Sequence, residues 1–303
     1  MKTCRIYSRN AFAAFTNNMS WMKSILTLIL APLMALSFAV PGAWSQAMPL
    51  EEVPFVTTPD NVTLEMLSIA GVNASDFVMD LGSGDGRIVI LAARRFGARG
   101  LGVEIVPELV ALSNASAKSA GVADRAEFRE QDLFRTDFSP ASVITMYLLP
   151  EVNMQLRPAM LALKPGTRIV SHDWDMGDWK PDRTSVVAVP DKKIGLEKSS
   201  KVHLWVVPAN VRGTWCGSGL LRGTQIKLEQ QFQEFRGTVM RGERVRQLDG
   251  TIVGDSLQPS PRSAAQLGLT VQGNLLRITS AEGNLALLQG ASFTRTSAAT
   301  CAP

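Results

Sequence analysis

The chain has 303 residues, of which 46% are hydrophobic, 19% are charged and 7% are aromatic. This composition excludes a disordered or collagen-like chain, and the length exceeds that of one ordinary domain, so we expect a globular protein with two domains. The formal net charge is +4, but the excess lies before residue 51, and the remainder balances 27 bases against 27 acids, which excludes a global basic surface for nucleic acid.

The N-terminal segment has the features of a targeting sequence. Residues 25–40 are an uncharged apolar run that follows Lys23 and precedes a small-residue site ending at Ala47. This arrangement predicts a signal peptide at 1–47, cleaved after Ala47, and export to the periplasm or cell envelope. The run is shorter than the roughly 20 apolar residues of a spanning helix. A retained inner-membrane anchor and a mitochondrial presequence are the alternatives.

From residue 77 onward, short apolar runs alternate with segments whose apolar residues recur at helical spacing. The apolar runs predict buried strands at 77–81, 100–105, 125–129, 142–149 and 167–172. The segments between them predict helices at 87–96, 107–120 and 151–163. Two further extended runs, 184–189 and 201–207, predict a terminal hairpin. This order is typical of an α/β, Rossmann-like sheet of seven strands with helices on both faces.

The turn after the first strand is the strongest functional signal. Residues 80–86 read DLGSGDG, and glycines let the chain turn sharply and let a ligand approach the backbone. Such turns lie at the carboxyl edge of the sheet, where these folds bind ligands. Glu104 ends the next strand, where a carboxylate can accept both hydrogens of a ribose diol. Asp132 follows the third strand, where a side chain can contact an adenine. Together these positions predict a nucleoside ligand.

The glycine spacing distinguishes between nucleoside ligands. A dinucleotide-binding turn has the pattern G-x-G-x-x-G, and its third glycine would fall at Arg87. A G-x-G-x-G turn preceded by an acid instead suits a ligand without phosphate and with a positively charged amino-acid tail. S-adenosylmethionine is such a ligand.

These residues resemble the first motifs of the class I methyltransferases that depend on S-adenosylmethionine. Within that class the chain is similar to the membrane-associated lysine methyltransferases of the mitochondrial ATP synthase c-ring protein and to their bacterial relatives. The shared stretches are PFVTTP (54–59), DLGSGDGRIVI (80–90), GVEI (102–105), YLLP (147–150) and LKPGTRIVSH (163–172). The resemblance implies a methyltransferase domain at 48–208 that acts on a protein lysine, including lysines of membrane proteins. The cofactor-binding residues it implies are Thr58, Asp80, Gly82, Ser83, Gly84, Gly86, Glu104, Asp132 and Leu133.

The acceptor side is expected at the ends of the fourth and fifth strands. Tyr147 lies where many members of this class place a substrate-side residue, and an aromatic side chain packed in the sheet is the alternative. His172 and Asp173 end the fifth strand, and an imidazole can act as a base near neutral pH, although a structural histidine is the alternative. Methyl transfer requires alignment and exclusion of water, and a lysine must first lose its proton. We therefore predict that Tyr147, His172 and Asp173 are catalytic, with no metal.

After about residue 208 the helical periodicity disappears. Gly-Thr pairs at 213, 237 and 250 are each expected to begin a short strand. Residues 225–240 are expected to form an extended piece interrupted by a bulge, 251–265 a long loop, and 267–271, 274–279 and 284–289 further strands. These features predict a small antiparallel barrel or sandwich at 209–303. Cys216 and Cys301 pair if the protein is exported, and two free thiols are the alternative.

Two functions are consistent with the sequence. One is a methyltransferase that acts on a protein lysine, with the C-terminal domain recognising substrate, docking to the envelope or adding stability. The other is a non-catalytic envelope binding protein that retains the methyltransferase fold. Export is in conflict with a cofactor made in the cytoplasm, but the intact motif residues favour the enzyme.

Overall fold

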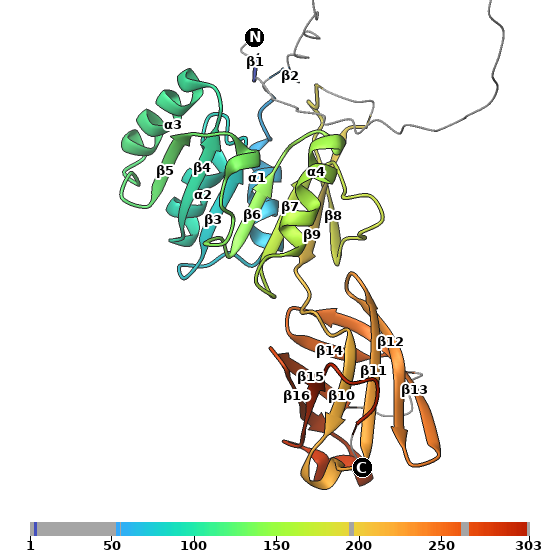
Figure 1. Cartoon of the computed structure of the whole chain (residues 1–303). Coiled ribbons are helices and arrows are strands. Elements are labelled where there is room, and N and C mark those ends of the chain that lie inside the picture. Colours follow the sequence, from blue (N-terminus) through green and yellow to red (C-terminus); the bar gives the residue numbers. More distant parts are fainter. Residues whose placement is uncertain (1–2, 5–52, 55, 194–196, 262–266, 302–303) are drawn as a thin grey trace, which may run out of the picture. The chain divides into compact units, whose positions relative to one another are not determined.

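A computed structural model describes residues 3–4, 53–54, 56–193, 197–261 and 267–301 (Figure 1). By its internal contacts the chain divides into two units, Met1–Phe55 and Val56–Pro303. In the first unit the structure describes an antiparallel pair of β1 (Thr3–Cys4) and β2 (Val53–Pro54). The apolar run expected to be a signal peptide or anchor lies outside the described residues. Among the described helices, none combines the length and apolar content that a membrane crossing requires.

Within the second unit, the described residues form a seven-stranded sheet with the order β5-β4-β3-β6-β7-β9-β8. Its strands are β3 (Phe77–Leu81), β4 (Arg99–Glu104), β5 (Ala126–Glu130), β6 (Val143–Met146), β7 (Arg168–His172), β8 (Arg183–Ala188) and β9 (Ser199–Val206). Strands β3 to β7 are parallel, whereas β9 pairs antiparallel with both β7 and β8. The predicted seven-stranded α/β sheet and its terminal hairpin are therefore confirmed.

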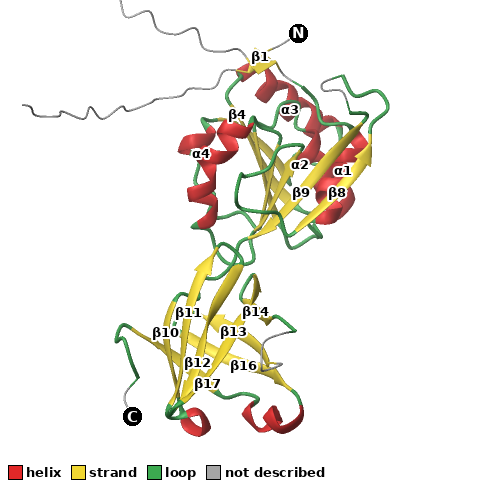
Figure 2. Cartoon of the chain, turned by 90° about the vertical axis from the view of Figure 1, so that its right-hand side faces the viewer, coloured by secondary structure: helices red, strands yellow, loops and turns green. Residues whose placement is uncertain are grey.

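Helices cover both faces of this sheet. They are α1 (Asp60–Ile69), α2 (Arg87–Phe96), α3 (Pro107–Ser119) and α4 (Pro150–Leu161). Figure 2 shows α4 on one face and α1 and α2 on the other. Helix α2 ends where the sequence predicts, because Gly97 adopts a left-handed φ of 69° and its amide bonds the Ala92 carbonyl.

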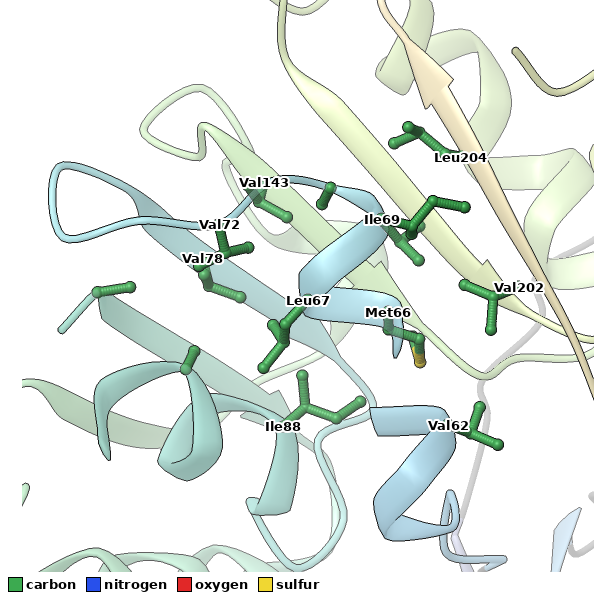
Figure 3. Packing of buried hydrophobic residues seen from close by; sticks show 14 of the residues in the cluster. Val62, Met66, Leu67, Ile69, Val72, Val78, Ile88, Val143, Val202 and Leu204 are labelled. Carbon is green, nitrogen blue, oxygen red and sulfur yellow. The ribbon is translucent and has the colours of Figure 1, made fainter. Parts of the chain in front are cut away.

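Helix α1 was not predicted from the sequence, and it packs against the end of the sheet formed by β7, β9 and β8. Its apolar residues Met66 and Leu67 are completely buried, and each contributes about 1.5–3 kcal/mol through burial. Both residues belong to a cluster of buried hydrophobic side chains from α1, α2 and neighbouring strands. Figure 3 labels ten of its members, which are Val62, Met66, Leu67, Ile69, Val72, Val78, Ile88, Val143, Val202 and Leu204. The cluster holds α1 against the sheet and so fixes the position of Thr58, which lies two residues before this helix.

The C-terminal residues form a closed barrel of eight antiparallel strands among the described residues, with β17 pairing back onto β10. The strands are β10 (Gly213–Gly217), β11 (Thr224–Gln231), β12 (Glu234–Arg241), β13 (Arg244–Val253), β14 (Ser256–Pro259), β15 (Leu267–Gln272), β16 (Leu275–Ala281) and β17 (Ser292–Thr296). A disulfide joins Cys216 in β10 to Cys301 near the end of the chain. The predicted antiparallel domain is confirmed and is a barrel.

Several predicted strand details in this domain are wrong. Residues 225–240 form the hairpin β11–β12, because the chain turns at Phe232, whose φ of 51° breaks the alternation where a bulge was expected. Gly237 and Gly250 lie inside strands, where a Cβ would clash with the backbone of the neighbouring strand. The expected loop at 251–265 contains the end of β13 and all of β14. Residues 284–289 fall largely in a 3-10 helix, η3 (Gly283–Leu288).

Candidate active site

The carboxyl ends of five parallel strands lie side by side at one edge of the sheet. In the order of the sheet, Asp132 follows β5, Glu104 ends β4, Asp80 lies near the end of β3, Tyr147 follows β6 and His172 ends β7. The fourth strand is shorter than predicted and stops at Met146, so Tyr147 lies just beyond the sheet. Parallel topology thus gathers side chains that are distant in the sequence along one edge.

The glycine-rich turn connects β3 to α2. Gly82, Gly84 and Gly86 have φ values of 73°, 54° and 81°, a region that favours glycine. A Cβ at Gly86 would lie 2.6 Å from Cζ of Phe128, so the turn is packed closely beneath the start of α2. Ser83 is buried, and its Oγ has no hydrogen-bond partner among the described residues. The turn therefore combines three glycines in left-handed conformations with a buried hydroxyl available to a ligand.

Glu104 holds this turn to the end of β4. Its buried carboxylate accepts the Gly84 amide at 3.0 Å, the Ile105 amide at 2.8 Å and the Val106 amide at 3.1 Å. Hydrogen bonds from backbone amides to a carboxylate are stronger than those between neutral groups. One side chain thus fixes both the glycine turn and the strand end beside it.

Asp80 is buried beneath the same turn. The Thr145 hydroxyl donates to its Oδ1 at 2.7 Å. Burial raises the pKa of Asp80 to about 7, and the nearby charges of Glu104 and Asp85 add to the rise, while the Thr145 bond opposes it. A buried carboxyl whose charged form is disfavoured by burial and by nearby acids is stabilised in that form by a positively charged ligand. The sequence analysis missed Thr145, although a polar residue inside the apolar run at 142–149 was a usable signal.

The predicted adenine-side residues follow β5. Asp132 begins a 3-10 helix, η1 (Leu133–Arg135), and its side chain accepts the Phe134 amide at 2.9 Å. The Gln131 amide donates to the Glu104 carbonyl at 2.9 Å, which places this segment next to the end of β4. Asp132 therefore also has a local capping role.

A cavity of about 300 Å³ lies at the ends of β6 and β7, on the predicted acceptor side. Its lining includes Tyr147 and His172, whose rings are in contact, with centroids 3.9 Å apart and planes tilted by 31°. Burial, followed by the charge of Asp173, raises the pKa of Tyr147, so this hydroxyl is protonated at neutral pH. The structure thus brings two of the three predicted catalytic residues to one cavity.

His172 is held on both sides of its ring. Its Nδ1 lies 3.2 Å from the Thr58 hydroxyl and its Nε2 lies 2.9 Å from the Ser200 hydroxyl. Burial lowers the pKa of His172 to about 4, with Asp173 opposing and Lys192 adding to the decrease. A neutral imidazole with both nitrogens engaged favours the structural alternative: it positions Tyr147 and Thr58 and is a weak base.

Asp173 is held in an ion pair beside this cavity. It has a φ of 62°, accepts the Lys201 amide at 2.9 Å and lies 2.8 Å from Nζ of Lys192. The sequence analysis missed Lys192 and Ser200, which line the cavity. The predicted terminal hairpin was the available signal, because antiparallel pairing of β9 with β7 returns the β8–β9 connection to the carboxyl edge.

Comparison with known proteins identifies the same region. Residues 80–183 match the family model described as the ANTKMT methyltransferase domain. The chain is 41% identical over 157 residues to a protein-lysine N-methyltransferase of Saccharolobus islandicus (strain REY15A), covering 51% of this chain and 94% of that relative. It is 33% identical over 132 residues to the adenine nucleotide translocase lysine N-methyltransferase of Mus musculus, covering 43% of this chain and 57% of that relative.

One solved structure is also similar in sequence. The chain is 52% identical to an RNA methyltransferase from Salinibacter ruber in complex with S-adenosyl-L-homocysteine, covering 52% of this chain and 96% of that chain with a TM-score of 0.46. The chain thus spans nearly the whole Saccharolobus relative and little more than half of the mouse relative.

Proposed function

Because this chain belongs to the class I methyltransferases that use S-adenosylmethionine, we propose that it transfers the methyl group to a lysine side chain of a protein. The observation that carries the proposal is the cavity lined by Tyr147 and His172, next along the sheet edge from the glycine turn. The name of the Saccharolobus relative, which the chain covers almost completely, supports lysine as the acceptor. We assign 48–208 to the methyltransferase domain and 209–303 to the barrel domain.

The residues at the carboxyl edge fit this cofactor. When bound, S-adenosylmethionine supplies a methyl group on a positively charged sulfur. The buried carboxyl of Asp80 suits the ammonium group of the methionine tail, and the glycines at 82, 84 and 86 allow the left-handed backbone of the turn. We assign Glu104 to the ribose and Asp132 with Leu133 to the adenine side, while Thr58 joins the cofactor side to the acceptor cavity through its bond to His172.

The cavity also suits a lysine that must react as a neutral amine. Apolar side chains contribute to its lining, and they are Val56, Pro59, Val189 and Pro190. Removal of an ammonium group from water lowers its pKa, so the acceptor releases its proton to water on entry and needs no strong protein base. The neutral nitrogen can then form a bond to the methyl carbon as the bond from that carbon to sulfur breaks, which would leave S-adenosylhomocysteine. Tyr147, fixed by the His172 ring, orients the amine.

The test is incubation of the protein with methyl-labelled S-adenosylmethionine and a membrane extract, followed by identification of the labelled molecule. We expect the label on the side-chain nitrogen of a protein lysine. A matched incubation with total RNA is the control. Label that enters RNA and no protein would overturn the lysine assignment while leaving methyl transfer intact.

Tyr147→Phe is expected to lower kcat about 10- to 100-fold, because the variant keeps the ring in contact with His172 and loses the hydroxyl that orients the amine. Cofactor affinity should stay within about twofold, since the assigned cofactor residues lie at other strand ends. Steady-state kinetics and calorimetry measure the two quantities. Unchanged kcat would remove Tyr147 from the acceptor site.

Affinity for S-adenosylmethionine is expected to rise as the pH increases through about 7. Burial raises the pKa of Asp80 from 3.8 to about 7, so between these values the folded protein holds a proton that the unfolded chain has released. This group's contribution to folding stability therefore falls as the pH rises across that interval. A cationic ligand favours the ionised form of Asp80 and therefore binds best at a pH above the pKa of about 7. Calorimetry across this range should show a pH dependence that Asp80→Asn removes, and an unchanged profile in the variant would contradict the assignment.

We further propose that the protein is exported, with residues 1–47 as a signal peptide and with an inner-membrane anchor or a mitochondrial presequence as the alternatives. The bond between Cys216 and Cys301 supports this, because disulfides persist in oxidising compartments. A phosphatase that is active only after export, fused after Pro303, should be active. Activity only from a reporter that works in the cytoplasm would contradict export.

A further inference from the structure

One end of the barrel carries an unusual set of exposed residues. Because consecutive strands are antiparallel, the connections β10–β11, β12–β13 and β16–β17 all leave the barrel at this end, and Figure 2 shows the two short helices of the first and third connections there. We call it the basic end, and its exposed residues are Leu220, Arg222, Arg241, Arg244, Val245, Arg246 and Leu287.

The apolar members of the basic end are unusually open to solvent. The exposed fractions are 84% for Leu287, 67% for Leu220 and 56% for Val245. Among the large hydrophobic residues that the structure describes, these are three of the four most exposed. Exposed apolar side chains at the same end of a barrel indicate a contact surface.

The arginines of the basic end lack neutralising partners. In the described part of the chain none of the four forms an ion pair with an acid, and Glu243 and Glu282 are the acids in these connections. Arg241 and Arg244 are direct cross-strand partners, an arrangement of like charges that destabilises a hairpin. Residues 209–303 contain 10 bases and 6 acids, whereas 48–208 contain 17 bases and 21 acids. The positive excess therefore belongs to the barrel and suits an anionic partner.

We propose that the basic end docks onto an anionic phospholipid bilayer. The leucines enter the boundary between headgroups and acyl chains, and the arginines bind lipid phosphates. A single-stranded nucleic acid is disfavoured because it needs aromatic side chains on which bases stack. The barrel's Trp215, Phe235 and Phe293 are buried, and Phe232 lies in the β11–β12 turn at the opposite end.

The test is sedimentation of residues 48–303 with vesicles, since Val56–Pro303 is one compact unit that keeps every element of the sheet and barrel. We expect binding to vesicles that contain phosphatidylglycerol and little binding to phosphatidylcholine alone. Arg244→Glu/Arg246→Glu should weaken the partition at least about tenfold, and Leu220→Ser/Leu287→Ser should do so as well. Lys227→Glu/Arg277→Glu is the matched control, because it makes the same charge change at exposed positions of β11 and β16 that are not part of the basic end.

Circular dichroism and thermal unfolding of each variant show whether the barrel is folded and keep this test independent of the methyltransferase assignment. Loss confined to the variants at the basic end supports the proposal. Three results overturn it: no binding of the folded protein to anionic vesicles, an equal loss in the control, or binding of an RNA oligonucleotide without binding to vesicles.

Discussion

Glu104→Gln is expected to weaken S-adenosylmethionine binding about 10- to 100-fold. The carboxylate uses both oxygens to accept three backbone amides, from Gly84, Ile105 and Val106. Glutamine has one acceptor oxygen, and in either orientation its amide group points hydrogens at a backbone donor. The loss of one charge-assisted bond costs about 1.5–3 kcal/mol, which corresponds to roughly the stated factor. The glycine turn then loosens together with the assigned ribose contact.

Calorimetry measures this affinity, and thermal unfolding checks that the variant is folded. Glu108→Gln is the matched control, because Glu108 lies exposed in the first turn of α3 and makes the same change of charge. We expect the control to bind within about twofold of the parent protein, as surface substitutions cost little. Full affinity in a folded Glu104→Gln protein would exclude Glu104 from the cofactor site.

Gly86→Ala is expected to reduce the free energy of unfolding by about 2–4 kcal/mol and to abolish measurable cofactor binding. The added Cβ would lie 2.6 Å from Cζ of Phe128 and 2.9 Å from Cβ of Ser113, and the φ of 81° is strained for alanine. Phe128 belongs to a buried cluster that includes residues of α2 and α3, so moving its ring would disrupt close packing. The turn must shift instead, and the cofactor site shifts with it.

Gly121→Ala separates crowding from backbone strain. Gly121 has a similar φ of 71°, but nothing lies within 4 Å of the position its Cβ would take. This variant should lose only about 1 kcal/mol and bind S-adenosylmethionine normally. Chemical denaturation and calorimetry compare the two variants. Equal losses in both would show that packing against Phe128 contributes nothing.

The sequence was sufficient for the parts of the fold that depend on local patterns. Residues 77–81 and the glycine-rich turn that follows at 82–86 predicted a strand, a turn and a helix. Each of these elements depends on residues that are close together in the sequence. Helix α1 was missed, because no element was predicted between Pro59 and the first strand at 77. In the barrel, the turn at Phe232 was not predicted, because a pattern of hydrophobicity does not show that an apolar residue adopts a positive φ.

By itself the sequence determined the α/β sheet and the glycine turn with its flanking acids, because each depends on spacing along the chain, and its motifs resemble those of the methyltransferase class. Only the tertiary structure decided the protonation and partners of those groups. The pKa values of Asp80 and His172 follow from burial, and the contacts of His172 with Thr58 and Ser200 join segments far apart in the chain. Burial and long-range pairing arise only when the strands assemble, so no local pattern can specify them.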